Sequence, residues 1–197
     1  MKKHTTTKTL LLGGSFNPIH NGHLIISRYI AESLGISKVL LIPSGNHPTK
    51  RKRDQLLPGD IRLEIIKEAI KNDPFFDVCD YELTQKDTTY TYKTIKWFQE
   101  TFNKTKKETY WMIGDDIVNK VLRWHKIELL LETANIVVAS RDPEKVREQD
   151  SKLIFVDTPL IDISSSNIRE RVENNKSIDY LVPDRVNKYI KDNNLYE

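Results

Sequence analysis

Short apolar runs alternate along the chain with longer segments in which apolar residues recur at helical spacing. Six of these runs are predicted strands, at 9–13, 38–43, 75–83, 109–114, 135–140 and 153–157. Most are continuous rather than alternating, which is typical of strands that are buried on both faces. The alternation of strand and helix therefore predicts right-handed βαβ units and an α/β fold with a doubly wound parallel sheet.

Stripes of apolar residues predict the helices that connect these strands. The first stripe ends at Gly35, a favourable residue for a helix C-terminus, and a terminal helix has Pro183 in its first turn. The four connecting stripes are Leu24, Ile26, Ile30 and Leu34; Ile61, Ile65, Ala69 and Ile70; Ile95, Phe98 and Phe102; and Ile117, Val121 and Leu122. The terminal helix is expected to bury Val186, Tyr189 and Ile190. No repeat or long linker divides residues 1–197, so we expect a single domain whose part from about 160 to 197 is helical.

The composition of the chain argues against several classes of protein. The 31 basic and 28 acidic residues leave a net charge of +3, too small an excess for wholesale nucleic-acid binding. One cysteine, Cys79, excludes an internal disulfide and fits a reducing compartment. The apolar run Leu10–Leu12 is too short for a secretory signal, and no segment approaches the ~20 apolar residues of a membrane span. A soluble cytoplasmic protein is therefore expected.

The charge cluster 49–54 is either a solvated loop or a basic loop beside an anionic ligand.

Glycines and histidines follow the first predicted strand in the segment GGSFNPIHNGHL, 13–24. Ligands of doubly wound sheets bind at the carboxyl ends of strands, where glycines permit close approach and a helix N-terminus attracts anions. His20 and His23 are three residues apart and share one helix face, so both can meet one phosphate chain. The segment lacks the ending of a Walker loop, and two histidines do not complete a zinc shell. It favours a phosphate site over a glycine turn with two unrelated histidines.

A second candidate phosphate site follows the last predicted strand, in IDISSSNIRER, 161–171. Small hydroxyl residues at a loop-to-helix junction are good N-caps, which is the structural interpretation of Ser164, Ser165 and Ser166. Hydroxyls, helix N–H groups and the guanidinium of Arg169 one turn further on also suit a phosphate. The two interpretations are compatible.

Both segments match motifs of one enzyme superfamily. GSFNPIHNGH resembles the G-[ST]-F-D/N-P-x-H-x-G-H motif of the HxGH nucleotidyltransferases, and ISSSNIR resembles their I-S-S-T-x-I-R motif. Within that superfamily the chain is most similar to the nicotinate-nucleotide adenylyltransferase family. The similarity continues through 41–50, 88–95, 111–116, 122–130, 137–141 and 177–196, which is essentially the entire chain in order.

The resemblance implies a Rossmann-like nucleotidyltransferase fold and a reaction in NAD biosynthesis. Nicotinate mononucleotide would attack the α-phosphorus of ATP in line, giving deamido-NAD and pyrophosphate without a covalent intermediate. ATP and nicotinate mononucleotide are then the partners, with no nucleic acid and no membrane. Mg²⁺ would be bound through the ATP phosphates, with no metal site made by the protein. The oligomeric state stays open, with a homo-oligomer as one option.

The family's residue roles carry over by position. His20, His23 and Arg169 resemble the catalytic residues that hold the triphosphate as pyrophosphate leaves. The implied ATP-binding residues are Gly13, Gly14, Ser15, Phe16, His20, His23, Ser164, Ser165, Ser166 and Arg169. The implied substrate-binding residues are Asn17, Lys50, Tyr90, Thr91, Gly114, Asp116, Trp124 and Arg141. Trp124 resembles the aromatic residue that stacks on the pyridine ring, and its alternative role is ordinary core. We expect backbone N–H groups around Tyr90 and Thr91 to receive the nicotinate carboxylate.

Three positions depart from the family pattern. Asn17 stands where many bacterial members have Asp, Thr49 replaces a histidine, and Lys93 replaces an acidic residue. These departures concern substrate contacts rather than the phosphate motifs. Two other functions compete: adenylyl transfer to another phosphorylated acceptor such as phosphopantetheine, and catalytically silent nucleotide binding. Histidine titrates near pH ~6.5, so the sequence leaves the charge of His20 and His23 open.

Overall fold

In the computed structural model, six parallel strands form one sheet in the order β3-β2-β1-β4-β5-β6. The structure describes residues 7–45, 56–121, 124, 126–140 and 152–197. The strands are β1 (Thr9–Gly14), β2 (Lys38–Pro43), β3 (Phe76–Val78), β4 (Thr109–Gly114), β5 (Asn135–Ser140) and β6 (Ile154–Asp157). β1 pairs in parallel with β4, β4 with β5, and β5 with β6. This confirms the doubly wound sheet, whose order reverses between β1 and β4.

The strand predicted at 75–83 is much shorter than expected. β3 contains three residues, and the chain turns at Asp80 into the short helix α3 (Tyr81–Thr84). Acidic residues at 77, 80 and 82 explain the difference, since they do not suit a strand buried on both faces. The other five strands begin and end within one residue of the predicted positions.

The helices follow the first three apolar stripes, whereas in the fourth only Val121 lies on a helix, since Ile117 lies in a 3₁₀ turn and Leu122 is outside the described residues. α1 (Asn21–Ser33) ends two residues before Gly35, whose φ of 61° is the left-handed conformation expected at a helix C-terminus. The further helices are α2 (Gly59–Ile70), α4 (Thr91–Phe102), α5 (Val118–Val121), α6 (Ile127–Thr133), α8 (Ser165–Glu173) and α9 (Asp184–Asp192), with 3₁₀ turns η1 (Lys106–Glu108) and η2 (Asp115–Ile117). None of the helices among these residues is long and apolar enough to cross a membrane.

The chain divides into two compact units, described here one at a time. Unit 1 contains residues 1–12, 26–40 and 90–160, and unit 2 contains residues 13–25, 41–89 and 161–197. The division separates the candidate residues, because both phosphate motifs belong to unit 2 and the candidate pyridine-binding residues belong to unit 1. The single-domain expectation stays a prediction.

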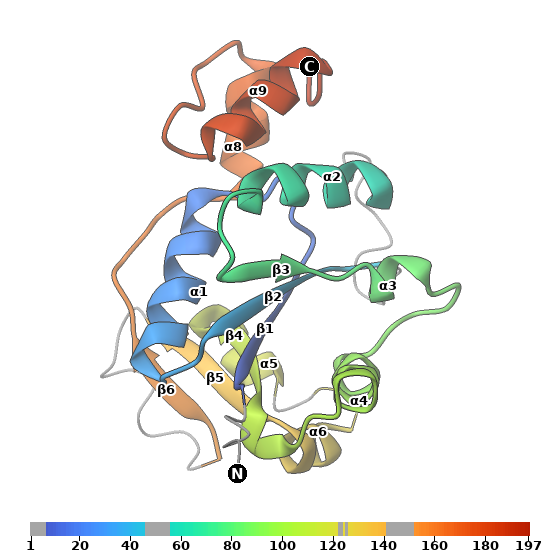
Figure 1. Cartoon of the computed structure of the whole chain (residues 1–197). Coiled ribbons are helices and arrows are strands. Elements are labelled where there is room, and N and C mark those ends of the chain that lie inside the picture. The colour runs from blue at the N-terminus through green and yellow to red at the C-terminus, as the bar shows by residue number, and fades with distance from the viewer. Residues whose placement is uncertain (1–6, 46–55, 122–123, 125, 141–151) are drawn as a thin grey trace. The chain divides into compact units, whose positions relative to one another are not determined.

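Unit 1 is built on β4, β5 and β6. Its strands bury Trp111, Ile113, Val137 and Val138, each at most 5% exposed. Helices α4 and α6 lie against each other in this unit (Figure 1). The side-chain amide of Gln99 joins them, since its Nε2 donates to the carbonyl of Thr133 at 2.7 Å.

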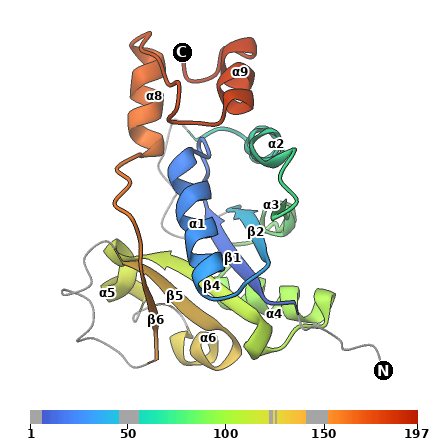
Figure 2. The same cartoon turned by 60° about the vertical axis from the view of Figure 1, so that its left-hand side comes forward.

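In unit 2, α2 packs against α9 (Figures 1 and 2). Val186 and Ile190 of α9 are buried as expected, but Tyr189 is half-buried and Asn187 is buried in its place. The Nδ2 of Asn187 donates to Asp179 Oδ1 at 2.6 Å, which offsets part of the cost of its burial. Pro183 is the N-cap of α9, immediately outside the helix rather than within its first turn.

Candidate active site

The loop after β1 combines an unusual backbone conformation with a closely packed aromatic ring. Phe16 adopts a left-handed conformation with φ of 44°, and its ring is buried at 1% exposure. A β-carbon on Gly14 would lie 3.0 Å from the ring atom Cζ of Phe16. Gly14 is therefore needed so that the Phe16 ring can fold back over the strand end.

The two histidines of the motif lie in direct contact. Their rings stack with centroids 3.6 Å apart at an angle of 27°, and the Phe16 ring meets His23 edge-on at 5.1 Å. The backbone N–H of His20 donates to Nδ1 of His23 at 3.3 Å. The neutral tautomer of His23 that fits this bond carries its proton on Nε2.

His20 is more deeply placed, at 6% exposure. Its Nδ1 is buried and has no hydrogen-bond partner among the described residues. A β-carbon on Gly22 would lie 3.0 Å from that nitrogen, so the glycine between the histidines leaves room for the His20 ring. An unpaired buried nitrogen beside the stacked ring of His23 suits a ligand that supplies the missing partner.

Burial keeps both histidines neutral at pH 7 in the chain without ligand. It lowers the pKa of His20 to about 4. It also lowers the pKa of His23 well below the ordinary value, and the neighbouring His20 lowers that pKa further. The protonation state that the sequence leaves open is thus decided by packing.

Each serine at the start of α8 has a different partner. Ser164 is the N-cap, since its hydroxyl oxygen accepts the backbone N–H of Asn167 at 3.1 Å. Ser165 donates its hydroxyl to the carbonyl of Pro18 at 2.8 Å, and so attaches α8 to the loop after β1. The two motifs, which are far apart in the sequence, are therefore joined within unit 2.

Arg169 also attaches α8 to the loop after β1 through its guanidinium group. Its Nη1 donates to the carbonyl of Asn17 at 2.8 Å, and its Nη2 donates to the Ser166 hydroxyl at 3.3 Å. Its Nε is buried without a hydrogen-bond partner among the described residues. A guanidinium with an unused donor at a helix N-terminus suits an anion with several oxygens, such as a polyphosphate.

Asn17, one of the departures from the family motif, accepts hydrogen bonds from two segments that are distant in the sequence. Its side-chain oxygen accepts the backbone N–H of Leu57 at 3.3 Å and the hydroxyl of Tyr196 at 3.0 Å. An aspartate would offer an oxygen to the same two donors, so asparagine serves this role without a charge. Burial raises the pKa of Tyr196, which keeps this hydroxyl protonated.

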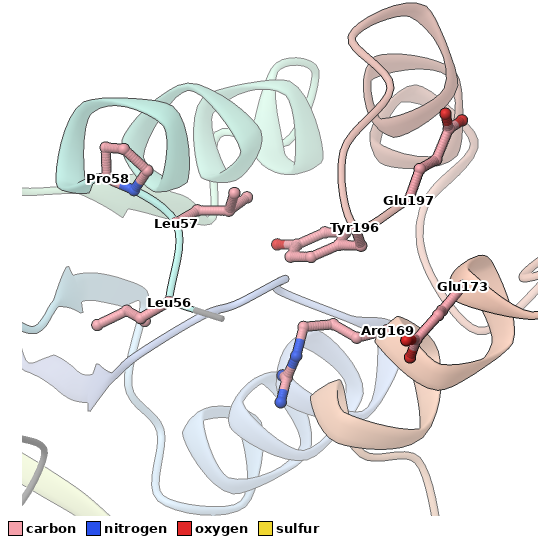
Figure 3. Close-up of a pocket in the computed structure, with 7 residues that line it drawn as sticks. All are labelled: Leu56, Leu57, Pro58, Arg169, Glu173, Tyr196 and Glu197. Carbon is pink, nitrogen blue, oxygen red and sulfur yellow. The ribbon is translucent and has the colours of Figure 1, made fainter. Parts of the chain in front are cut away.

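A cavity of about 260 Å³ lies beside Arg169 in unit 2 (Figure 3). Arg169 and Tyr196 line one part of it, and the segment 56–58 lines another. Glu173 and Glu197 add carboxylates to the lining. The cavity is thus bounded by the same residues that hold Asn17 and the loop after β1.

Sequence reasoning missed Arg62 and Tyr196. Arg62 is 3% exposed, and it donates to three backbone carbonyls, among them that of Ser15 in the loop after β1. The sequence carried one signal for it, because Arg62 shares the apolar face of α2 with Ile65 and Ile66. Tyr196 had no such local signal, since it contacts Asn17 across 179 positions.

Unit 1 contains the residues expected to bind the pyridine nucleotide. Thr91 is the first residue of α4, where the backbone N–H has no acceptor within the helix, and Tyr90 is the N-cap. Gly114 ends β4, and Asp116 lies in η2 directly after it. Trp124 is half-buried in the turn before α6, so it is not an ordinary fully buried core residue.

Some candidate residues lie outside the described part of the chain. These are Lys50 and Arg141, together with Thr49 and the basic cluster 49–54. Lys93 is described, and it is exposed in the first turn of α4. Within the described ranges, no three or more His, Cys, Asp or Glu side chains form a group that could hold a metal ion.

Comparison with known proteins places this site in a family. The family model that matches is described as cytidylyltransferase-like, and it covers residues 11–171, which include both motifs. A probable nicotinate-nucleotide adenylyltransferase of Clostridium novyi (strain NT) is 38% identical over 95% of this chain and 98% of its own length. One of the same name from Dehalococcoides mccartyi (strain CBDB1) is 39% identical over 96% of this chain and 97% of its own.

Solved structures show the same fold at lower identity. The nicotinic acid mononucleotide adenylyltransferase of Plasmodium falciparum, complexed with NaAD, is 22% identical with a TM-score of 0.75, covering 96% of this chain and 97% of that one. A putative nicotinate-nucleotide adenylyltransferase from Vibrio parahaemolyticus is 20% identical with a TM-score of 0.71, covering 96% and 95%. With relatives at 38–39% identity over nearly its whole length, the chain belongs to the nicotinate-nucleotide adenylyltransferase family of cytidylyltransferase-like proteins.

Proposed function

We propose that this chain transfers AMP from ATP to nicotinate mononucleotide through the residues gathered in unit 2. One observation carries the proposal. The stacked pair of His20 and His23 lies on the loop that Ser165 and Arg169 attach to the start of α8. Buried nitrogens of His20 and Arg169 have no hydrogen-bond partner in the described chain, which is what a site for a bound polyphosphate requires.

The reaction is an in-line displacement at the α-phosphorus of ATP. A phosphate oxygen of nicotinate mononucleotide forms the new bond to phosphorus, and the bond to the bridging oxygen breaks, so that pyrophosphate leaves with that electron pair. His23 donates from Nε2, and Arg169 supplies a fixed positive charge. The protein acts mainly by positioning and charge stabilisation.

The bound triphosphate also changes the histidines. A nearby polyanion favours the charged form of imidazole, so we expect ATP to raise the lowered pKa values of His20 and His23. Mg²⁺ bound through the ATP phosphates would neutralise part of the phosphate charge. Because Mg²⁺ usually keeps several waters, it would need no dedicated carboxylate cage.

The residues that we propose for the pyridine ring of nicotinate mononucleotide belong to unit 1. We propose that the ring of nicotinate mononucleotide stacks on the half-buried Trp124, and that N–H groups at the start of α4, including that of Thr91, receive the carboxylate. A carboxylate needs only donors, whereas an amide also needs an acceptor, so this arrangement favours nicotinate over nicotinamide.

A cytoplasmic location fits the single Cys79, whose thiol pKa burial raises to about 11.

Pyrophosphate release from ATP and Mg²⁺, with nicotinate or nicotinamide mononucleotide as acceptor, tests the proposal. The nicotinate compound should give the higher kcat/KM. Phosphopantetheine is the third acceptor, and turnover with it alone would assign the chain to another adenylyl transfer. ATP binding without pyrophosphate release for any acceptor would indicate a silent nucleotide-binding protein.

Two variants test the residues. His23→Ala and Arg169→Ala should each lower kcat about 10²–10³-fold, the effect of removing one preorganised donor. Arg185→Ala is the control, because Arg185 is half-exposed and pairs with Glu68 at 3.6 Å rather than with a residue of either motif. Turnover like that of the wild type from a folded His23→Ala protein would contradict the assigned role.

A further inference from the structure

Arg62 is a buried cation in α2 that the proposed reaction does not use. Its side chain comes from the apolar face of the helix, and it is 3% exposed. A buried guanidinium is costly unless its donors are satisfied. The partners that satisfy it therefore indicate what the residue does.

These partners are backbone carbonyls on three separate segments of unit 2. Nη1 donates to Ser15 at 2.8 Å in the loop after β1, and Nη2 donates to Ser44 at 2.9 Å directly after β2. Nε donates to Leu57 at 3.0 Å, just before α2 begins. One planar side chain thus joins the ends of two neighbouring strands to the start of a helix.

The contact with Ser15 leads directly to the histidines. Ser15 precedes Phe16, which holds the left-handed φ of 44°. The Phe16 ring then meets His23 edge-on at 5.1 Å, and His23 stacks on His20 at 3.6 Å. A fixed Ser15 carbonyl therefore fixes the orientation of the residue that packs against the histidine pair.

A second path reaches the same loop through Leu57. While its carbonyl accepts Nε of Arg62, the N–H of Leu57 donates to the side chain of Asn17 at 3.3 Å. Arg62 thus contacts the loop after β1 directly at Ser15, and it also contacts Leu57, the residue that donates to Asn17. Arg169 and Ser165 hold the next carbonyls, those of Asn17 and Pro18.

We infer that Arg62 is a positioning residue for adenylyl transfer, which orients the His20–His23 pair through the backbone of residues 15–17. This inference rests on the proposed function. Lysine cannot replace arginine here, because a single ammonium cannot reach three carbonyls that a planar guanidinium meets from three nitrogens. Misplacement of the histidines should slow the chemical step more than it weakens ATP binding.

The test combines kinetics with an NMR measurement of the histidine rings. Arg62→Lys and Arg62→Met should lower kcat about 10–10²-fold with KM for ATP within about threefold. The imidazole Cε1–H signals of His20 and His23, assigned with His20→Gln and His23→Gln, should shift in both variants without ligand. Arg185→Met is the matched control, and its kcat and histidine signals should equal those of the wild type.

A purely structural role predicts a different result: a lower melting temperature, but unchanged kcat per folded molecule and unshifted histidine signals. That result with Arg62→Lys would overturn the inference. If Arg62→Met does not fold, Arg62→Lys decides alone, since it keeps the charge and the aliphatic stem. If the wild type releases no pyrophosphate, the proposed function fails, and the histidine signals of Arg62→Lys still decide the positioning role.

Discussion

At the scale of single residues, the site is shaped by close contacts that leave no room for extra atoms. Gly14 lies under the Phe16 ring, and Gly22 lies under the His20 ring, with hypothetical β-carbons 3.0 Å from the nearest ring atom in both cases. Neither glycine has a positive φ, so space rather than backbone freedom explains them. The glycine between the two histidines is thus part of how His20 is placed.

This contact gives a prediction for Gly22→Ala. The added methyl group should displace His20 and lower kcat about 10–10²-fold. Stability should not fall in proportion, because alanine is favoured over glycine within α1 by up to about 1 kcal/mol. Pyrophosphate release and urea denaturation measure the two effects.

Gly35→Ala is the control for this prediction, because it should lower stability without lowering kcat. Gly35 has φ of 61°, and a β-carbon there would meet nothing within 4 Å. Alanine should cost about 1–2 kcal/mol of stability through backbone strain, with kcat unchanged. Equal kcat for Gly22→Ala and the wild type would contradict the geometry assigned to His20.

At the scale of elements, one loop of unit 2 is held by hydrogen bonds from three other segments. The segment 15–18 receives hydrogen bonds from α2 through Arg62, from α8 through Arg169, and from the segment after α9 through Tyr196. Such supports would preorganise the groups that this loop carries for the proposed reaction.

The contribution of the segment after α9 can be measured with Tyr196→Phe. Loss of the hydroxyl removes the hydrogen bond to the Asn17 side chain and should cost about 1 kcal/mol in urea denaturation. Tyr180→Phe is the control, since Tyr180 is 88% exposed and should lose nothing measurable. Equal stability of the two variants would show that the bond to Asn17 contributes no net stability.

At the scale of the whole molecule, the residues proposed to bind the triphosphate and those proposed to bind the pyridine ring belong to different compact units. The proposed triphosphate residues belong to unit 2, and Trp124, Thr91 and Asp116 belong to unit 1. Substitutions in the two units should therefore affect the two substrates separately.

Trp124→Ala tests this separation. Loss of the stacking surface should raise KM for nicotinate mononucleotide about tenfold, corresponding to ~1.4 kcal/mol, with KM for ATP within about threefold. Trp124→Phe should recover most of the affinity, because it keeps an aromatic face. A lower melting temperature with unchanged KM for both substrates would instead show that Trp124 is a structural residue and not a binding residue.

Much of the fold could be predicted because its signals are local. Strand positions follow from short apolar runs, and the parallel order follows from their alternation with helices. The strand at 75–83 was wrong because aromatic and β-branched residues outweighed three acidic residues in the prediction. The place of Tyr189 on α9 was wrong for a similar reason, since periodicity alone did not reveal that Asn187 has a hydrogen-bond partner in Asp179.

The sequence by itself determined the fold class, the two motif segments and the family, because each depends on residue spacing along the chain. Only the tertiary structure decided that the histidines stack and are neutral, that Asn17 joins Leu57 to Tyr196, and that Arg62 donates to the loop after β1. These properties depend on burial and on hydrogen bonds between residues 40 to 179 positions apart. Such contacts exist only when the folded backbone brings distant segments together, and they leave no periodic pattern in the sequence.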